Sequence, residues 1–131
     1  MTIIESKASI QKPVSEVFSF LTDLNNHQQL MPENIYNWSS TTDEARFTIQ
    51  NMAKLALKVS DRQKDRSITI VPSEEAPFAV ELKWILSDTG GATEAALVIS
   101  ADLNMMMKML ASGPLQKLAD HQTKTLAKVL A

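Results

Sequence analysis

The fold is decided by residues 8–23, ASIQKPVSEVFSFLTD, where one hydrophobic periodicity gives way to another. Before Pro13 the side chains alternate, with Ile4, Ala8 and Ile10 on one parity and charged or amide residues on the other. A period of two is typical of a half-buried strand. After Pro13, a residue that the first turn of a helix tolerates, the apolar spacing becomes helical. The sequence therefore predicts a strand followed by a short amphipathic helix, whose apolar face holds Val14, Val17, Phe18 and Leu21.

A second short helix is predicted directly after the first. Asp23 belongs to the residue types that cap helix N-termini, and Leu24, His27 and Leu30 recur behind it at helical spacing. Pro32 cannot continue this helix, because it lacks a backbone N–H and its ring clashes with the preceding turn. Two short helices are therefore expected between the first and second strands.

Residues 35–103 alternate in segments separated by turn residues or charge clusters, which predicts six antiparallel strands. The cleanest alternation has its apolar positions at Phe78, Val80, Leu82, Trp84 and Leu86. A tight turn is expected at Gly90 and Gly91, since glycine accepts a positive φ without a steric clash. The strand after this turn has its apolar face at Ala95, Leu97, Ile99, Ala101 and Leu103.

After Asn104 the hydrophobic period changes to about 3.6 residues, which predicts a long closing helix. Its apolar stripe consists of Leu115, Leu118, Gln122, Leu126, Val129 and Leu130. The segment 105–110 also has a helical pattern. Gly113 and Pro114 therefore either kink one long helix or separate a short helix from a longer one.

Composition excludes several classes of protein. The 131 residues suit a single domain, residues 1–131, and the absence of cysteine excludes disulfide scaffolds and thiolate metal sites. With 13 Lys and Arg against 15 Asp and Glu, the net charge of −2 offers no field for nucleic acid. The longest apolar run, residues 95–99, is far shorter than a membrane span of roughly 18 residues. The first residues lack an apolar signal region, so a cytoplasmic protein is expected.

The order of elements predicts an α+β fold in which a seven-stranded antiparallel sheet wraps around the long C-terminal helix. The apolar face of such a sheet must be covered, and only the last helix is long enough. A helix about 10 Å wide cannot fill the concave side of a strongly curved sheet of this size. The remaining space holds either packed side chains or a ligand.

The chain resembles the START-like or SRPBCC superfamily, which includes Bet v 1-like and polyketide cyclase/dehydrase proteins. The resemblance rests on residues 8–23, on the step Leu30-Met31-Pro32 with an aromatic strand after it, and on the order of elements. It implies the helix-grip fold and a lipid, sterol, polyketide, quinone or plant hormone bound between sheet and helix. Some members are cyclases, hydrolases or protein-interaction domains. The superfamily shares no universal catalytic motif, so the resemblance implies no catalytic residue.

The candidate ligand-binding residues are the side chains expected to point from the sheet toward the helix. Large apolar surface, with a hydrogen-bonding group on Tyr or Trp, is expected from Tyr36, Trp38, Phe47, Phe78 and Trp84. Ser6 and Asn51 fall on the same face and need polar partners, which a ligand can supply. His27 is expected at the cavity mouth. The ordinary alternative is packed core for the sheet residues and partial exposure for His27.

The methionines of segment 105–109 are unusual in number. Flexible, polarizable thioethers suit a pocket that repacks around varied apolar ligands, and they also suit a partner surface. On a helix they cannot all face the core. We hypothesise that this segment is a mobile gate at one end of the cavity, with Met106 and Met107 contacting the ligand.

These features favour non-catalytic binding of a small lipophilic molecule such as a fatty acid, isoprenoid, quinone or polyketide-like compound. Two histidines in separate helices do not have metal-ligand spacing, so neither a metal nor a cofactor is expected. One alternative is a cyclase or dehydratase, with His27, Tyr36, Asn51 or His121 as the available acid–base groups. The other is a protein-interaction module that uses the methionine segment and the closing helix.

Overall fold

The computed structural model describes residues 2–50, 53–76 and 78–131. In these ranges the strands are β1 (Thr2–Ile10), β2 (Ile35–Ser40), β3 (Glu44–Ile49), β4 (Ala53–Gln63), β5 (Ser67–Pro72), β6 (Val80–Asp88) and β7 (Thr93–Ala101). The helices are α1 (Val14–Leu21), the short 3-10 helix η1 (Leu24–Leu30) and α2 (Met105–Val129). The element order confirms the predicted α+β architecture.

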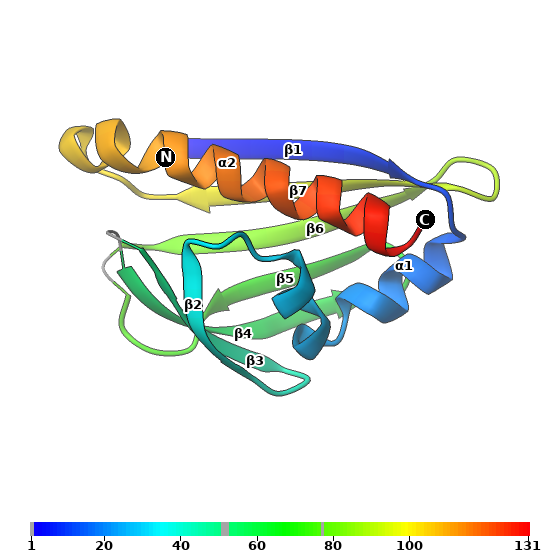
Figure 1. Cartoon of the computed structure of the whole chain (residues 1–131), viewed down its shortest axis with the longest axis horizontal. Coiled ribbons are helices and arrows are strands. Elements are labelled where there is room, and N and C mark those ends of the chain that lie inside the picture. The colour runs from blue at the N-terminus through cyan, green and yellow to red at the C-terminus, as the bar shows by residue number, and fades with distance from the viewer. Residues whose placement is uncertain (1, 51–52, 77) are drawn as a thin grey trace.

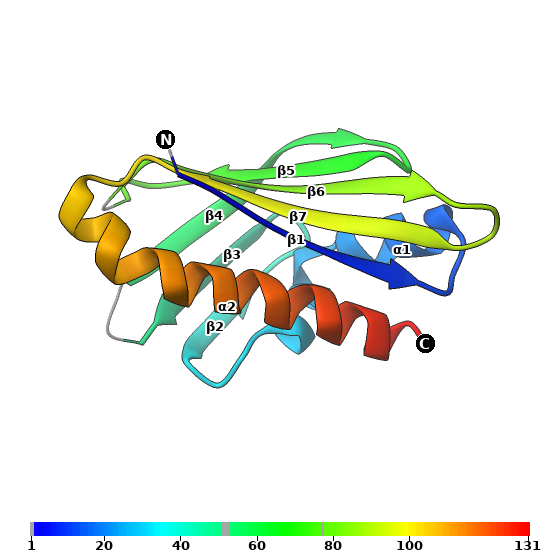
Figure 2. The ribbon, with the colours of Figure 1, turned by 90° about the horizontal axis from the view of Figure 1, so that it is seen from above.

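All seven strands form one antiparallel sheet in the order β1-β7-β6-β5-β4-β3-β2. The first strand therefore pairs with the last, and the two short helices connect the opposite edges of the sheet. Figures 1 and 2 show the sheet curling around α2, with α1 and η1 near the C-terminal end of that helix. This wrapping is the helix-grip arrangement that the sequence predicted.

The core follows the predicted parity on β6 and β7. On β6, Val80, Trp84 and Leu86 are buried, and Trp84 is only 1% exposed. On β7 the buried positions of the predicted face are Ala95, Leu97, Ile99 and Ala101. Helix α2 packs against β1 and β7, and four residues of its stripe are buried, namely Leu115, Leu118, Gln122 and Leu126. Apolar burial at this sheet–helix contact is the main stabilising contribution to the fold.

Helix α2 runs without interruption past Gly113 and Pro114, which settles the open choice in favour of one long helix. Asn104 caps it, because its Oδ1 accepts a hydrogen bond from the backbone N–H of Met107 at 2.9 Å. Pro114 lies inside the helix and removes one backbone donor there. Among the helices in the described ranges, none has the length and apolar character needed to cross a membrane.

The predicted orientation of Tyr36 is wrong. The register of β2 against β3 shifts between Tyr36 and Ser39, and Asn37 adopts a left-handed φ of 56°. Such a bulge resets the alternation of side chains between the two faces. Tyr36 is therefore 46% exposed, although Trp38, two residues later, is half-buried and packs against the core.

Arg62 ties the end of α1 to the turn between β2 and β3. Its Nε donates to Thr22 Oγ1 at 2.7 Å, and its Nη2 donates to the Thr22 carbonyl at 2.9 Å. The same Nη2 forms an ion pair with Asp43 at 2.7 Å. Because one guanidinium on β4 binds groups from these two segments, it fixes how the short helices meet the sheet edge.

We expect Arg62→Ala to lower the free energy of unfolding by about 1–2 kcal/mol, since it removes several charge-assisted hydrogen bonds at a partly exposed site. Urea denaturation measures this change. Arg66→Ala, at an exposed position on the same hairpin, is the matched control and is expected to cost less than about 0.5 kcal/mol. Equal losses in the two variants would contradict the assigned role of Arg62.

Candidate functional site

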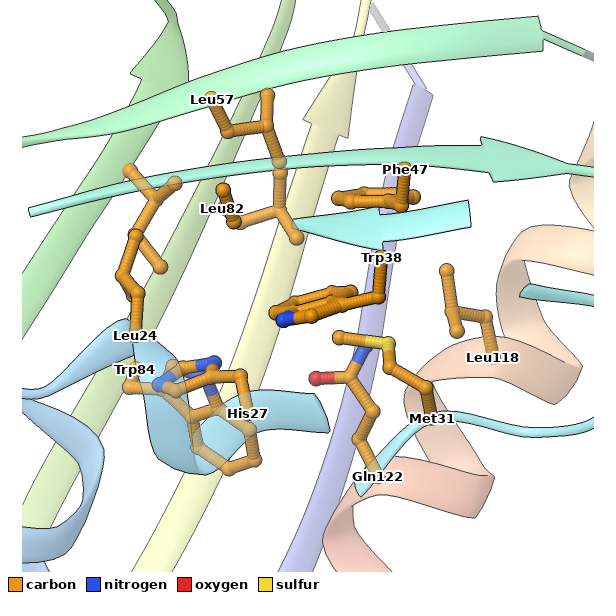
Figure 3. A pocket seen from close by; sticks show the side chains of 12 residues that line it. Leu24, His27, Met31, Trp38, Phe47, Leu57, Leu82, Trp84, Leu118 and Gln122 are labelled. Atoms are coloured by element: carbon orange, nitrogen blue, oxygen red, sulfur yellow. The ribbon is translucent and has the colours of Figure 1, made fainter. Parts of the chain in front are cut away.

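A small cavity of about 30 Å³ lies between the sheet and α2. Its walls come from η1 and the residue after it, from strands β2 to β6, and from α2 (Figure 3). The twelve lining residues are Leu24, His27, Met31, Trp38, Ala45, Phe47, Leu57, Ile70, Leu82, Trp84, Leu118 and Gln122. The structure therefore brings four predicted site residues together, namely His27, Trp38, Phe47 and Trp84.

An aromatic pair forms one wall of the cavity. The rings of Trp38 and Phe47 are stacked, with centroids 5.3 Å apart and planes inclined by 13°. The Trp38 indole N–H donates to Ser40 Oγ at 2.9 Å, and Ser40 in turn donates to Asn25 Oδ1 at 2.8 Å. The bulge in β2 points Trp38 inward, and this hydrogen-bond chain ties its ring to η1. The wall is therefore both apolar and fixed in orientation.

His27 is buried at 4% exposure, deeper than the cavity-mouth position expected from the sequence. Its Nε2 lies 2.8 Å from the Leu21 carbonyl oxygen. A carbonyl only accepts hydrogen bonds, so Nε2 carries the proton and Nδ1 of the neutral ring keeps its lone pair. Burial lowers the pKa of His27, while the bond to Leu21 and the charge of Asp23 oppose this shift. The rings of His27 and Trp84 are nearly perpendicular, with planes inclined by 83° and centroids 6.5 Å apart.

Gln122 is the second polar residue of the lining and is 2% exposed. Within the described residues, every fully buried side-chain N or O atom has a hydrogen-bond partner. None of the side-chain hydrogen bonds in these residues involves the Gln122 amide. Its N and O atoms are therefore not fully buried, and they are exposed to the cavity that Gln122 lines. Figure 3 shows the amide directed into this space. The sequence placed Gln122 on the apolar stripe, and a polar residue at a core position was the signal for a functional role.

Two predicted residues are buried elsewhere. Ser6 on β1 has a protein partner, because its Oγ lies 2.8 Å from Thr123 Oγ1 on α2. Phe78 is buried at 8% exposure, but it precedes β6 and does not line the cavity. Ser6 therefore needs no ligand to satisfy its hydroxyl, and Phe78 is part of the core.

The remaining predicted residues do not reach the cavity within the described part of the chain. Tyr36 points outward because of the bulge in β2. Met106 is 73% exposed and Met107 is half-buried, both in the first turns of α2 and outside the lining. Asn51 lies outside the described residues. The gate hypothesis for segment 105–109 stays a prediction.

A surface groove of about 360 Å³ adjoins the cavity along α2. It is lined by Pro32, Asn34, Pro114, Lys117, Leu118 and His121. Leu118 belongs to both linings, and Met31 of the cavity is followed directly by Pro32 of the groove. Leu118 and the segment 31–32 therefore lie where the cavity and the groove meet. His121 is exposed in this groove and does not line the cavity.

The chemistry of the lining is apolar with two neutral hydrogen-bonding groups. Ten of the twelve residues are aliphatic, thioether or aromatic, and none is Asp, Glu, Lys or Arg. Within the described ranges, no group of three or more His, Asp or Glu side chains is arranged to hold a metal ion. The site is therefore suited to contact an apolar molecule and to hydrogen-bond one polar group on it.

No protein-family model and no curated protein sequence matches this chain. Solved structures match it over nearly its full length. A START superfamily protein from Mycobacterium smegmatis aligns with a TM-score of 0.69 and 16% identity, covering 98% of this chain and 96% of the other. The chain has the START-like helix-grip fold. The superfamily resemblance seen in the sequence is thus confirmed at the level of fold.

Two further solved structures align over a similar length. An aromatase/cyclase from a Streptomyces species has a TM-score of 0.74 and 11% identity, with 98% of this chain and 93% of the other covered. The protein XoxI from Bacillus cereus has a TM-score of 0.79 and 11% identity, with 99% and 96% covered. At such low identities the likeness establishes the START-like architecture and leaves the function to the residues of the cavity.

Because burial lowers the pKa of His27 below its ordinary value of 6.5, the unfolded chain binds a proton there more readily than the folded chain. The free energy of unfolding is therefore expected to fall as the pH drops below about 6.5, until the folded pKa is reached. Urea denaturation over this pH range measures the slope. His27→Gln keeps a side-chain N–H donor but does not titrate, so it flattens the slope.

Gln28→Ala, an exposed substitution on η1 that neither adds nor removes a titrating group, is the matched control. Its slope is expected to equal that of the unsubstituted protein. If His27→Gln kept the full slope, burial of His27 would not be its cause.

Proposed function

We propose that this START-like protein binds and carries a small lipophilic molecule in the cytoplasm, between the sheet and α2. The observation that supports this most directly is the chemistry of the cavity, which combines an apolar lining with only two polar groups, on His27 and Gln122. Apolar burial would supply the driving force, at about 25 cal/mol per Å² removed from water. The two polar groups would fix the orientation of the ligand.

The ligand has to widen the cavity as it enters. A volume of about 30 Å³ has room for about one water molecule, whereas ligand pockets usually enclose about 300–1,000 Å³. The neighbouring groove of about 360 Å³ meets it at Leu118 and the segment 31–32. Displacing this segment from α2 would join the two spaces. The thioether of Met31 suits this role, because methionine repacks easily.

The cyclase or dehydratase alternative has less support from the lining. General acid–base chemistry needs a positioned donor and acceptor at the reacting atoms. Among the described lining residues His27 is the one titratable side chain near neutral pH, and its Nε2 is bonded to the Leu21 carbonyl. A carrier needs only binding and release, which this lining supplies without a second acid or base.

A protein-interaction module is the second candidate function. The first turns of α2 expose large apolar side chains, with Met105 at 82%, Met109 at 81% and Leu110 at 71% exposure. Such a patch is typical of a partner surface when the interior itself is filled. This candidate differs from the carrier in predicting that no small molecule accompanies the protein.

Native mass spectrometry of the purified protein, with organic extraction of any adduct, separates these candidates. A carrier retains a stoichiometric apolar compound, or gains thermal stability from isoprenoids, quinones or fatty alcohols, because a ligand of the native state stabilises it by mass action. A bare mass with no thermal shift across the panel would overturn the carrier proposal and favour the interaction module.

Both tryptophans of the chain line the cavity, so intrinsic fluorescence reports its occupancy. We expect a bound ligand to change the emission, and Ala45→Val, which narrows the cavity, to weaken binding by about tenfold or more. Ala96→Val is the matched control, since Ala96 is buried on β7 but does not line the cavity. Equal affinities in the two variants would place the ligand elsewhere.

A further inference from the structure

Resting on the proposed function, we infer that the ligand carries a neutral hydroxyl group, and that His27 and Gln122 bind this group inside the cavity. A hydroxyl head group favours alcohols over quinones, ketones and ionised fatty acids.

The two polar side chains reach the cavity from two elements that contact each other. His27 comes from η1, and Gln122 comes from the C-terminal half of α2. Both are more than nine-tenths buried. Polar groups at such positions ordinarily have protein partners, because an unsatisfied buried group is costly. The free amide of Gln122 and the free nitrogen of His27 therefore point to a polar partner supplied from within the cavity.

The hydrogen-bonding capacity of this pair is specific. With Nε2 donating to the Leu21 carbonyl, Nδ1 of the neutral imidazole acts as an acceptor. The Gln122 amide offers both a donor and an acceptor. A ligand hydroxyl can donate to His27 and accept from Gln122. A carbonyl oxygen can accept from Gln122 but has no hydrogen to donate to His27 Nδ1. A carboxylate, which has only acceptors, leaves His27 Nδ1 facing another acceptor.

Charge leads to the same conclusion. None of the described lining residues is Lys or Arg, so the cavity has no cation to neutralise a buried anion. Lys117 lies in the neighbouring groove and not in the cavity. A fatty acid could place its carboxylate near Lys117 only by covering His27 and Gln122 with its hydrocarbon tail. That orientation leaves both polar groups without partners.

The test compares probes that differ only in the head group, dodecanol with dodecanoate and farnesol with farnesoate, by tryptophan fluorescence titration at about pH 8, where the acids are ionised. We expect each alcohol to bind at least about tenfold more tightly than its carboxylate. Gln122→Met, which keeps the size of the side chain but removes its hydrogen bonds, is expected to reduce this preference at least about threefold. His27→Phe is expected to reduce it as well.

Gln116→Met is the matched control on the same helix, because Gln116 bonds the Glu5 carbonyl and Asp120 and does not line the cavity. It is expected to leave the preference unchanged. If alcohols and carboxylates bind with equal affinity, the head-group inference is wrong while the carrier proposal stands. The same follows if Lys117→Gln weakens the binding of carboxylates but not that of alcohols. If no probe of either kind changes the emission, both are overturned.

Discussion

The concave face of the sheet presents more apolar surface than a single helix can cover, and the interior is organised around this mismatch. Helix α2 packs along it through Leu115, Leu118 and Leu126, and large side chains from the strands fill most of what the helix leaves. Trp84 projects from the middle of β6 and the Trp38–Phe47 stack closes the other side. The residual cavity is therefore small, because the indole rings of Trp38 and Trp84 occupy much of the space. The cavity also borders η1 and Met31.

The polar lining follows from the way the short helices end. The last carbonyls of a helix have no partner within it, and α1 ends directly before η1. Asn26 donates to the Phe20 carbonyl at 3.0 Å and His27 donates to the Leu21 carbonyl at 2.8 Å. One nitrogen of His27 thus secures the junction between α1 and η1, and the other nitrogen of the neutral ring remains an acceptor. The same side chain serves the fold and the site.

Regular periodicity made most of the architecture predictable, and local backbone exceptions limited the rest. On β6 and β7 the alternation is unbroken, so the inward position of Trp84 followed directly from counting residues. On β2 the left-handed Asn37 interrupts the alternation, and no sequence pattern marked it, so Tyr36 was assigned to the wrong face. The sequence identified Gln122 as a polar residue on an apolar stripe. Helical spacing alone does not predict whether its amide contacts a strand residue or lines a cavity.

The boundary between the cavity and the groove lies close in the chain to both polar residues of the lining. Leu118 lies one helical turn from Gln122 on α2. Met31 directly follows η1, the short helix whose middle residue is His27. A ligand that pushes the segment 31–32 away from α2 therefore moves the end of η1, while the bond from His27 to Leu21 holds its middle against α1. Because η1 would move at its C-terminal end and stay anchored at His27, the cavity can widen while the imidazole keeps its bond to the Leu21 carbonyl. Under the proposed function, His27 and Gln122 would stay in place while the apolar wall moves, which is the arrangement a carrier needs for both selectivity and exchange.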